Sequence, residues 1–394
     1  MIDIPLFLRV PPQGRYNRGI YTCYECGFEP PYYNVVPCML GLAEISAGTM
    51  VVWECPRCGQ KWMFHYRAQN SREAHDYAAQ LLAYRTGDPD WRGWAALLDE
   101  KVTAYLPDLK YIHDEPLARH TSFRIGGPAT RMAFPTSGEQ IVLLTGFAQE
   151  CGVTPFLLGN GTNLLVADEG LDTLVIQTGE GLNRIALDGG IITADAGVSL
   201  ARLGVFAWQH SLTGLEFAHG IPGSLGGGVV MNAGAYGGEL KDVLTEVTAL
   251  FPDGVRTLRG EELALGYRRS FFTDHPEAVV LRAKLALHGG DQEAIKARME
   301  ELSAKRRASQ PLEMPSAGST FKRPEGYFAG TLIEQCGLKG KHVGGAEVSR
   351  KHAGFVVNAG GATCADVLAL IKKVQDTVFT ATGVTLEPEV KIIR

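Results

Sequence analysis

Two CxxC pairs near the start of the chain have the spacing of a metal site. Cys23 and Cys26 form one pair and Cys55 and Cys58 the other; glycine follows each pair directly, and 28 residues separate them. Four thiolates that converge in this way coordinate Zn²⁺ tetrahedrally at about 2.3 Å, which leaves no open position for catalysis. Clustered cysteines in a chain without a secretion signal hold metal more often than they form disulfides. We therefore predict a structural zinc.

The residues around these pairs leave the role of the first segment open. Cys38 follows a proline and is not expected to be a ligand, and His65 is the substitute should one cysteine not bind. Completion of a small metal-stapled core is the first interpretation, and docking of an unknown partner or nucleic acid is the second. The aromatic and basic residues concerned are Tyr32, Tyr33, Trp53, Arg57, Lys61, Trp62 and Arg67.

Glycine-rich and polar stretches farther along the chain could hold a large ligand. They read TSFRIGGPA (121–129), GNGTNLLV (159–166), GIPGSLGGGVVMNAGAYGGEL (220–240), GYRRSFF (266–272) and PSAGSTFKRP (315–324). No P-loop, dinucleotide fingerprint or nucleophile elbow can be laid over them. Glycine turns can offer several backbone N–H groups to a pyrophosphate without a lysine. Any one of them alone can be an ordinary tight turn, but two such turns far apart in the sequence favour a long ligand between domains.

Together these stretches resemble the UDP-N-acetylenolpyruvoylglucosamine reductase (MurB) family of flavoenzymes. The resemblance covers about residues 105 to 394 and extends to HVGGAEVSRKHAGFVVNAGGATCADV and LEPEV. Only 46 residues separate Ser270 of YRRS from Ala317 of AGS, as in the subgroup without the extra active-site loop. Thr162 stands where serine is common, and Arg350 where an acid is usual. The first 105 or so residues have no counterpart in the typical family member.

The resemblance implies a fold and a cofactor. It implies a non-covalent FAD in a domain of the vanillyl-alcohol-oxidase (PCMH) type, followed by a C-terminal α/β substrate domain. The residues that it places around FAD come from three of the stretches. They are Arg124, Ile125, Gly126, Gly127, Gly159, Asn160, Gly161, Thr162, Asn163, Gly220, Ile221, Pro222, Gly223, Ser224, Gly227, Asn232, Ala233, Gly234 and Tyr236.

The resemblance also implies a reaction. NADPH reduces the flavin, hydride from the reduced flavin adds to C3 of the enolpyruvyl ether of UDP-N-acetylglucosamine, and a proton adds at C2 to give UDP-N-acetylmuramate for peptidoglycan. Arg268 matches the residue that stabilises the anionic intermediate, since a guanidinium stays charged. Ser319 matches the proton donor and needs neighbouring charge to give up its proton. Glu389 matches the third active-site residue.

Some neighbouring side chains are alternatives or lesser candidates. Glu387 competes with Glu389, because both could face the same side of an alternating strand. Tyr267 and Lys322 are substrate-binding candidates, although Tyr267 could merely pack. Arg269 is expected to be a solvated surface charge.

Secondary-structure patterns divide the chain into an α+β protein of several domains. We expect a zinc-ribbon-like domain over 1–68, a helical connector over 69–105 broken at GDP (87–89), an FAD-binding domain over 106–289 and a C-terminal domain over 290–394. Within the connector, a helical stretch is predicted around Trp94. Strong helices are predicted at 137–152, where Ser137 and Gln140 form a capping box, at 291–311 and at 363–383, where Thr363 and Asp366 cap the helix and Gly383 can end it. VTALFPDGVRTL predicts a hairpin turning at Asp253-Gly254, and VTLEPEVKIIR predicts an alternating strand.

Composition excludes several classes of protein. The chain has 394 residues, 45% of them hydrophobic, and a net charge of -5, which argues against nucleic-acid binding by the main domains. No apolar stretch reaches the roughly 18 residues of a membrane span, and Asp3 and Arg9 make the first ten residues a poor signal peptide. We therefore expect a cytoplasmic protein with no membrane contact.

Two other functions compete with a reductase. An FAD-linked oxidase acting on an alcohol or sugar would favour a covalent-flavin His or Cys near the FAD turns, and neither TSFRIGG nor GNGTN offers one. A zinc-ribbon adaptor with a degenerate flavin domain is disfavoured because Arg268, Ser319 and Glu389 are all retained.

Overall fold

The computed structural model describes residues 2–3, 50–54, 61–65, 93–179 and 181–394. It divides the chain into two compact units, residues 1–107 with 147–153 and residues 108–146 with 154–394. The four cysteines of the predicted zinc site, Cys23, Cys26, Cys55 and Cys58, lie outside the described residues, as does most of the predicted connector.

A small sheet and one helix are the described elements that lie wholly in the first unit. The sheet has the order β1 (Ile2–Asp3), β2 (Met50–Glu54), β3 (Lys61–His65), with β2 and β3 antiparallel. Helix α2 (Trp94–Tyr105) buries Ala95, Leu98 and Val102 at intervals of three and four, the spacing of one helix face. The helix predicted around Trp94 is confirmed.

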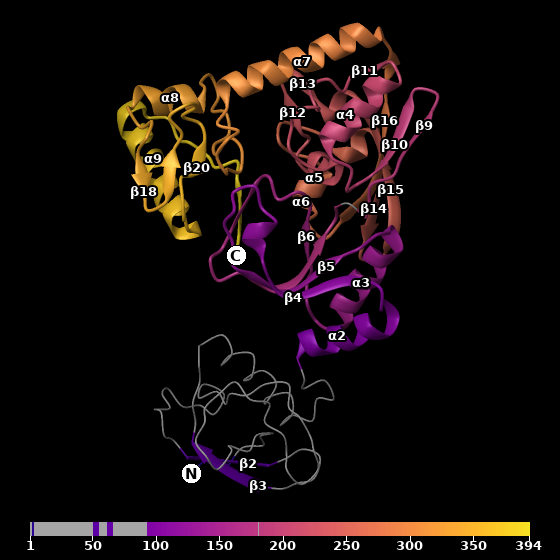
Figure 1. The fold of residues 1–394 in the computed structure, drawn as a ribbon, viewed down its shortest axis with the longest axis vertical. Coiled ribbons are helices and arrows are strands. Elements are labelled where there is room, and N and C mark those ends of the chain that lie inside the picture. The colour runs from indigo at the N-terminus through magenta and orange to yellow at the C-terminus, as the bar shows by residue number, and fades with distance from the viewer. Residues whose placement is uncertain (1, 4–49, 55–60, 66–92, 180) are drawn as a thin grey trace. The chain divides into compact units, whose positions relative to one another are not determined.

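A four-stranded sheet opens the second unit (Figure 1). Strand β4 is antiparallel to β5, whereas β5, β8 and β6 run parallel. Helix α3 (Gly138–Glu150) lies between β5 and β6 in the chain, as predicted. Its cap is half of a capping box: the N–H of Gln140 donates to Ser137 Oγ at 3.3 Å, but Gln140 Oε1 accepts from the N–H of Thr136 instead of Ser137. The strands are β4 (Lys110–Pro116), β5 (Pro128–Phe134), β6 (Phe156–Leu158) and β8 (Leu171–Gln177).

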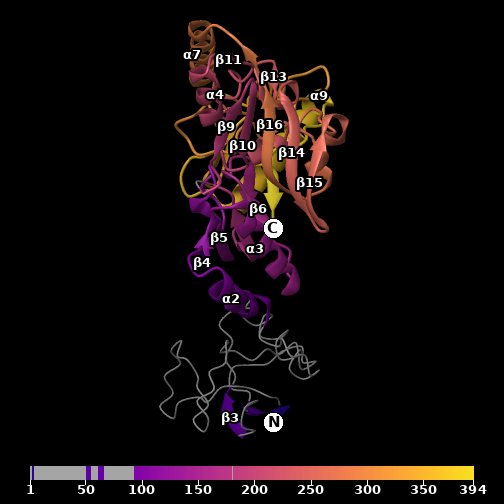
Figure 2. The same cartoon turned by 90° about the vertical axis from the view of Figure 1, so that its right-hand side faces the viewer.

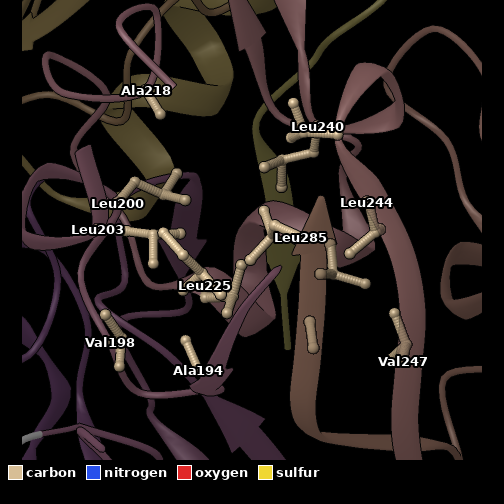
Figure 3. Packing of buried hydrophobic residues seen from close by; sticks show 14 of the residues in the cluster. Ala194, Val198, Leu200, Leu203, Ala218, Leu225, Leu240, Leu244, Val247 and Leu285 are labelled. Atoms are coloured by element: carbon tan, nitrogen blue, oxygen red, sulfur yellow. The ribbon is translucent and has the colours of Figure 1, made fainter. Parts of the chain in front are cut away.

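A five-stranded antiparallel sheet follows, with β15, β14, β16 and β10 side by side and β9 at the edge (Figure 2). Helices α4 (Leu200–Gln209) and α5 (Leu225–Val230) belong to its core. Figure 3 shows Leu203 of α4 and Leu225 of α5 in one apolar cluster with Leu285 of β16. This packing fixes α5, which lies within the longest glycine-rich stretch. The strands are β9 (Ile185–Asp188), β10 (Ile191–Asp195), β14 (Leu244–Phe251), β15 (Gly254–Arg259) and β16 (Val279–Ala286).

The hairpin of this sheet turns one residue earlier than predicted. Phe251 pairs with Gly254, so Pro252 and Asp253 form the two-residue loop. Gly254, with φ 126°, is the first residue of β15 rather than part of the turn.

Helix α7 (Gln292–Ser309) leads into the C-terminal module, which contains α8 (Ala329–Gln335) and α9 (Cys364–Thr382). Figure 1 shows α7 running from the β14–β16 sheet towards α8. The predicted caps of α9 are confirmed: Thr363 and Asp366 form a capping box, and Gly383 ends the helix at φ 72°. Strands β18 (His342–Val343), β19 (Ala346–Val348) and β20 (Val356–Asn358) form a small sheet beside it.

Asp168 links the segment that follows β7 to helix α9 of the C-terminal module. It follows β7 (Leu164–Val166), and its carboxylate accepts the N–H groups of Cys364 at 2.7 Å and Ala365 at 3.1 Å. The first N–H groups of a helix have no partner within the helix, so an acidic side chain from elsewhere stabilises α9.

The end of the chain departs from the predicted strand. Only Lys391–Ile393 form a strand, β21, which pairs in parallel with β7. Before it, Glu387 accepts the N–H of Lys322 at 2.8 Å and Glu389 donates its own N–H to the Thr320 carbonyl at 2.8 Å. This segment therefore holds the PSAGSTFKRP stretch in place.

Short elements complete the described fold, and none of its helices is long and apolar enough to cross a membrane. They are η2 (Leu117–Arg119), β11 (Leu212–Thr213), β12 (Gly234–Ala235), β13 (Gly238–Glu239), η3 (Leu240–Asp242), η4 (Gly260–Leu263), α6 (Phe271–Asp274) and β17 (His288–Gly289).

Candidate functional site

One large cavity, here called the main cavity, gathers residues from all five glycine-rich or polar stretches. Its volume is about 1450 Å³, larger than the roughly 300–1,000 Å³ of a pocket for one small ligand. Ser122, Asn160, Pro222, Arg268 and Ser319, one from each stretch, all line it. The cavity thus has room for a long cofactor together with a second ligand.

Hydrogen bonds between the stretches build the floor of the main cavity. Thr162 Oγ1 donates to the Pro222 carbonyl at 2.8 Å, which joins the GNGTN turn to the longest glycine-rich stretch. Ser122 donates its N–H to the Gly161 carbonyl at 3.1 Å and its Oγ to the Ser316 carbonyl at 2.6 Å. Segments that lie up to 194 residues apart in the sequence are therefore held as one surface.

The GNGTN turn fits a phosphate-bearing cofactor. Within the described part of the chain, the N–H groups of Asn160, Gly161 and Thr162 have no hydrogen-bond partner, and Gly161 is buried. Gly161 needs to be glycine, since its φ is 61° and a Cβ there would lie 2.2 Å from the His120 carbonyl oxygen. Successive free N–H groups in a glycine turn suit a phosphate. Apolar side chains such as Phe156 and Val280 supply the wall that a ring system requires.

Most of the residues predicted around FAD line the main cavity, and five do not. Those that line it are Arg124, Gly159, Asn160, Gly161, Thr162, Asn163, Ile221, Pro222, Gly223, Ser224, Gly227, Ala233, Gly234 and Tyr236. Those that do not are Ile125, Gly126, Gly127, Gly220 and Asn232.

Packing explains why three of these five residues, Ile125, Gly126 and Gly127, do not line the main cavity. Ile125 is buried in the core of the C-terminal module. A Cβ at Gly126 would lie 2.9 Å from Val166 Cβ, and one at Gly127 would lie 2.2 Å from the Asp168 carbonyl oxygen. These glycines let TSFRIGGPA pack against the turn that carries Asp168.

Gly220 and Asn232 brace the longest glycine-rich stretch. The Gly220 carbonyl accepts from Arg306. Asn232 is fully buried with φ 42°, and its amide donates to Glu239 at 2.7 Å and to the Gly266 carbonyl at 2.9 Å. Asn232 therefore positions the neighbouring wall without contacting the cavity.

An ion pair lines the part of the main cavity that is here called its charged end. Arg268 Nε donates to Glu389 Oε1 at 2.7 Å, and its Nη2 donates to the Gly234 carbonyl at 3.1 Å. Both side chains are largely buried, 24% and 15% exposed. Arg268 lies at the tip of a two-residue loop closed by Gly266 and Arg269, and its φ is 53°. A non-glycine residue in this region is uncommon and often marks a functional position.

Ser319 is held between two buried neighbours at the same end. Ala317 and Thr320 are 5% and 4% exposed, whereas Ser319 is exposed. Thr320 donates its N–H to the Gly354 carbonyl and accepts the N–H of Val356 on its hydroxyl. The backbone around Ser319 is thereby fixed while its side chain stays accessible.

A second cavity of about 380 Å³, here called the side cavity, meets the main cavity at this end. Arg268, Ser319, His352 and Glu389 line both cavities. Burial lowers the pKa of the half-buried His352 from its usual value. Its Nδ1 accepts the N–H of Gly354 at 3.1 Å, so the neutral ring carries its proton on Nε2.

Glu387, Lys322 and Tyr267 have different surroundings. Glu387 pairs with Lys322 at 3.1 Å; both side chains are exposed, and neither residue lines either cavity. Tyr267 is 59% exposed and lines the side cavity only. Of the two candidates Glu387 and Glu389, only Glu389 lines the main cavity, and substrate binding by Lys322 or Tyr267 remains a prediction.

Sequence reasoning missed Arg306 and did not assign His352 a place in the site. Arg306 lines the main cavity from the C-terminal end of α7, where basic residues usually lie in solvent and favour the helix dipole. The one available signal was its spacing of four from Leu302, on the buried face of the helix.

The comparisons with known proteins match both parts of the second unit. Residues 129–258 match the family described as "FAD binding domain", and residues 310–393 match "UDP-N-acetylenolpyruvoylglucosamine reductase, C-terminal domain". The UDP-N-acetylenolpyruvoylglucosamine reductase of Agathobacter rectalis is 52% identical over 307 residues, 75% of this chain and 97% of that protein. The chain belongs to the MurB family. The MurB structure from Thermus caldophilus has a TM-score of 0.63 at 36% identity, over 73% of this chain and 99% of that one.

A further MurB relative, from Caldanaerobacter subterraneus, is 47% identical over 300 residues, 76% of this chain and 99% of that protein. The predicted resemblance is confirmed, and so is the fold class for its two main parts: an FAD-binding domain of the vanillyl-alcohol-oxidase type and a C-terminal MurB domain. The chain is an FAD-dependent oxidoreductase. Among the residues that the structure describes, no group of His, Cys, Asp and Glu could hold a metal, and the zinc site remains a prediction.

Proposed function

We propose that this MurB-family chain reduces the enolpyruvyl ether of UDP-N-acetylglucosamine to UDP-N-acetylmuramate, with NADPH as the reductant, in the cytoplasm. One observation carries the proposal: the Arg268–Glu389 ion pair, at 2.7 Å, lines the same cavity as Ser319 and the GNGTN turn. The relatives named above as UDP-N-acetylenolpyruvoylglucosamine reductases support the choice of substrate.

The main cavity would hold FAD along its glycine-rich end. The N–H groups of residues 160–162 would bind the pyrophosphate, and Arg124, Pro222 and Gly223 would line the cofactor. FAD bound there supplies hydride transfer to C3 of the enol ether.

Arg268 would stabilise the negative charge that develops at C2 and on the adjoining carboxylate. A guanidinium does not titrate in the working range and offers several donors in a fixed plane. Two of its nitrogens already bond Glu389 and the Gly234 carbonyl. These contacts fix the plane before substrate binds, which is the preorganisation that makes such charges effective.

Ser319 would deliver the proton to C2. A hydroxyl is a weak acid, and the serine oxygen becomes negatively charged as it gives up its proton. The cationic Arg268, which lines the same cavity, would lower the free energy of that charged state. Because Ser319 also lines the side cavity, that cavity gives solvent a route to replace the proton. Glu389 would hold Arg268 in place and complete the proton-transfer group with Ser319.

Steady-state turnover tests this proposal. Purified protein should oxidise NADPH only when the UDP-enolpyruvyl sugar is present, and the product should be heavier by two hydrogens. NADPH oxidation supported equally by other enol ethers, or a product of unchanged mass, would contradict the proposed substrate.

We also propose a domain order of zinc-ribbon-like domain, helical connector, FAD-binding domain and C-terminal domain, with boundaries near residues 68, 105 and 289. Cys23, Cys26, Cys55 and Cys58 would hold one structural Zn²⁺, whose loss should leave the flavin site unchanged. Metal analysis of the whole chain should find about one zinc, and Cys23→Ser with Cys26→Ser should lose it while keeping reductase activity. Absence of zinc from the wild type would refute the site.

A further inference from the structure

Arg306 is a buried cation without a carboxylate partner among the described residues. It is only 9% exposed. One terminal nitrogen, Nη1, donates to the Gly220 carbonyl, and the buried Nε has no hydrogen-bond partner. Burial lowers the pKa of this guanidinium from its usual value, and the charge interaction and side-chain hydrogen bond with Tyr236 oppose the shift. A buried charge is strongly unfavourable unless it is paired and hydrogen-bonded.

The helix that carries Arg306 does not need a charge at this position. Ile295, Met299, Leu302 and Arg306 follow one another at spacings of four, three and four along the buried face of α7. An apolar side chain would continue this face and pack as well. The arginine therefore departs from the pattern that stabilises the helix, which indicates a role outside packing.

The surroundings of Arg306 form one wall of the main cavity. A Cβ placed on Gly220 would lie 3.3 Å from Arg306 Nε, so the guanidinium packs closely against this glycine. The Tyr236 ring lies 5.9 Å away, and Ser309 and Gln310 line the cavity next to it. Glu313, the nearest acid along the chain that lines the cavity, faces Lys351 at 3.8 Å.

We propose that Arg306 is the counter-ion of a phosphate group on a nucleotide bound in the main cavity. A guanidinium in a cavity wall stays charged, and its N–H groups suit phosphate oxygens. The phosphate belongs either to FAD or to the nucleotide sugar. The choice between these two rests on the proposed function, whereas the need for an anion does not.

Three binding measurements on Arg306→Leu test the assignment. They are FAD binding to flavin-stripped protein, uridine diphosphate binding to flavin-loaded protein, and inorganic pyrophosphate binding to stripped protein. Leucine continues the apolar face, so the thermal midpoint of the stripped variant should equal or exceed that of the wild type. The affinity for the nucleotide that uses Arg306 should fall about 10- to 100-fold, and the affinity for pyrophosphate with it.

Two further variants complete the test. Arg307→Gln changes the next residue, which is exposed and lines neither cavity, and it should bind all three probes as the wild type does. Arg306→Lys keeps the charge but lacks the planar guanidinium with its several N–H groups, so an intermediate loss is expected. This variant carries the test if Arg306→Leu does not fold.

The outcomes separate this inference from the proposed function. A loss confined to FAD or to uridine diphosphate supports it and identifies the ligand. Unchanged binding of all probes to Arg306→Leu, or an equal loss in Arg307→Gln, overturns it. Failure of the wild type to bind either nucleotide contradicts the proposed function, while Arg306-dependent binding of pyrophosphate would still support a phosphate site.

Discussion

The main cavity is walled by main chain at its glycine-rich end and by charged side chains at the end that holds Arg268. At the first, residues 160–162 contribute amide N–H groups, and glycine is required at 161 because a Cβ there would lie 2.2 Å from the His120 carbonyl oxygen. At the second, Arg268 and Glu389 meet at 2.7 Å beside the accessible Ser319. From this difference we predict that the first end binds by shape and backbone polarity, whereas the second acts through functional groups that can be exchanged.

This comparison implies that substitutions at the two ends fail in different ways. A side chain at the charged end can be exchanged with little change in folding, so the loss should fall on turnover. An added Cβ at the glycine end displaces backbone, so the loss should fall on stability and cofactor retention.

The largest effect is expected at Ser319. Ser319→Ala should keep its flavin and be bleached by NADPH at a normal rate, because that step needs no proton donor at C2. Recovery of the yellow absorbance on adding the enol-ether substrate should slow by roughly 100- to 10,000-fold, the usual worth of general acid catalysis. Stopped-flow absorbance separates the two steps, and an equal loss in both would mean that Ser319 is structural.

The second-largest loss of activity is expected at Glu389, and Glu387 provides a matched control. Glu389→Gln removes the charge that fixes Arg268 and should slow product formation by about 100-fold or more. Glu387→Gln alters an exposed pair outside both cavities and should stay within about twofold of the wild type. The reverse ranking of the two rates would show that the wrong carboxylate had been assigned.

At the glycine-rich end, Gly161→Ala and Gly189→Ala form a matched pair. Both glycines have φ near 60°, 61° and 58°, but no atom lies within 4 Å of a Cβ on Gly189. Gly189→Ala should cost about 1 kcal/mol of unfolding free energy from backbone strain alone. Gly161→Ala should cost a further 1–3 kcal/mol, roughly, from overpacking, and should lose flavin. Equal denaturation midpoints for Gly161→Ala and Gly189→Ala would argue against a tightly packed turn at Gly161.

The smallest effect concerns His352, which lines both cavities. Burial lowers its pKa, so between that value and about 6.5 the unfolded chain binds more protons than the folded one. Its contribution to stability is therefore complete above about pH 6.5 and is lost as pH falls through the folded pKa. The thermal midpoint of the wild type should drop more between pH 7.5 and 5.5 than that of His352→Gln, and parallel drops would contradict this.

Local signals in the sequence were enough to predict the long helices. The caps of α9 at Thr363, Asp366 and Gly383 and the apolar face of α7 lie within their own segments. Strand β21, by contrast, has only three residues and exists because β7 pairs with it. Its true extent depends on contacts more than 200 residues away in the sequence, which alternation cannot reveal.

The site was predictable in its motifs and less so in its geometry. Alternation alone could not separate Glu389 from Glu387, and only the resemblance favoured Glu389. The contact that distinguishes them is with Arg268, which lies 121 residues earlier. Gly126 and Gly127 were predicted to line the cofactor, but they pack against the Val166 side chain and the backbone at Asp168. Arg306 resembles a solvated helix end, and only its burial distinguishes it.

The most direct test of the account is an anaerobic titration of the wild-type protein. Protein bleached by NADPH should regain its yellow absorbance on addition of one equivalent of the UDP-enolpyruvyl sugar per flavin, with UDP-N-acetylmuramate as the product. Colour that returns with oxygen but not with this sugar would contradict the account, and so would a wild-type protein that binds no flavin.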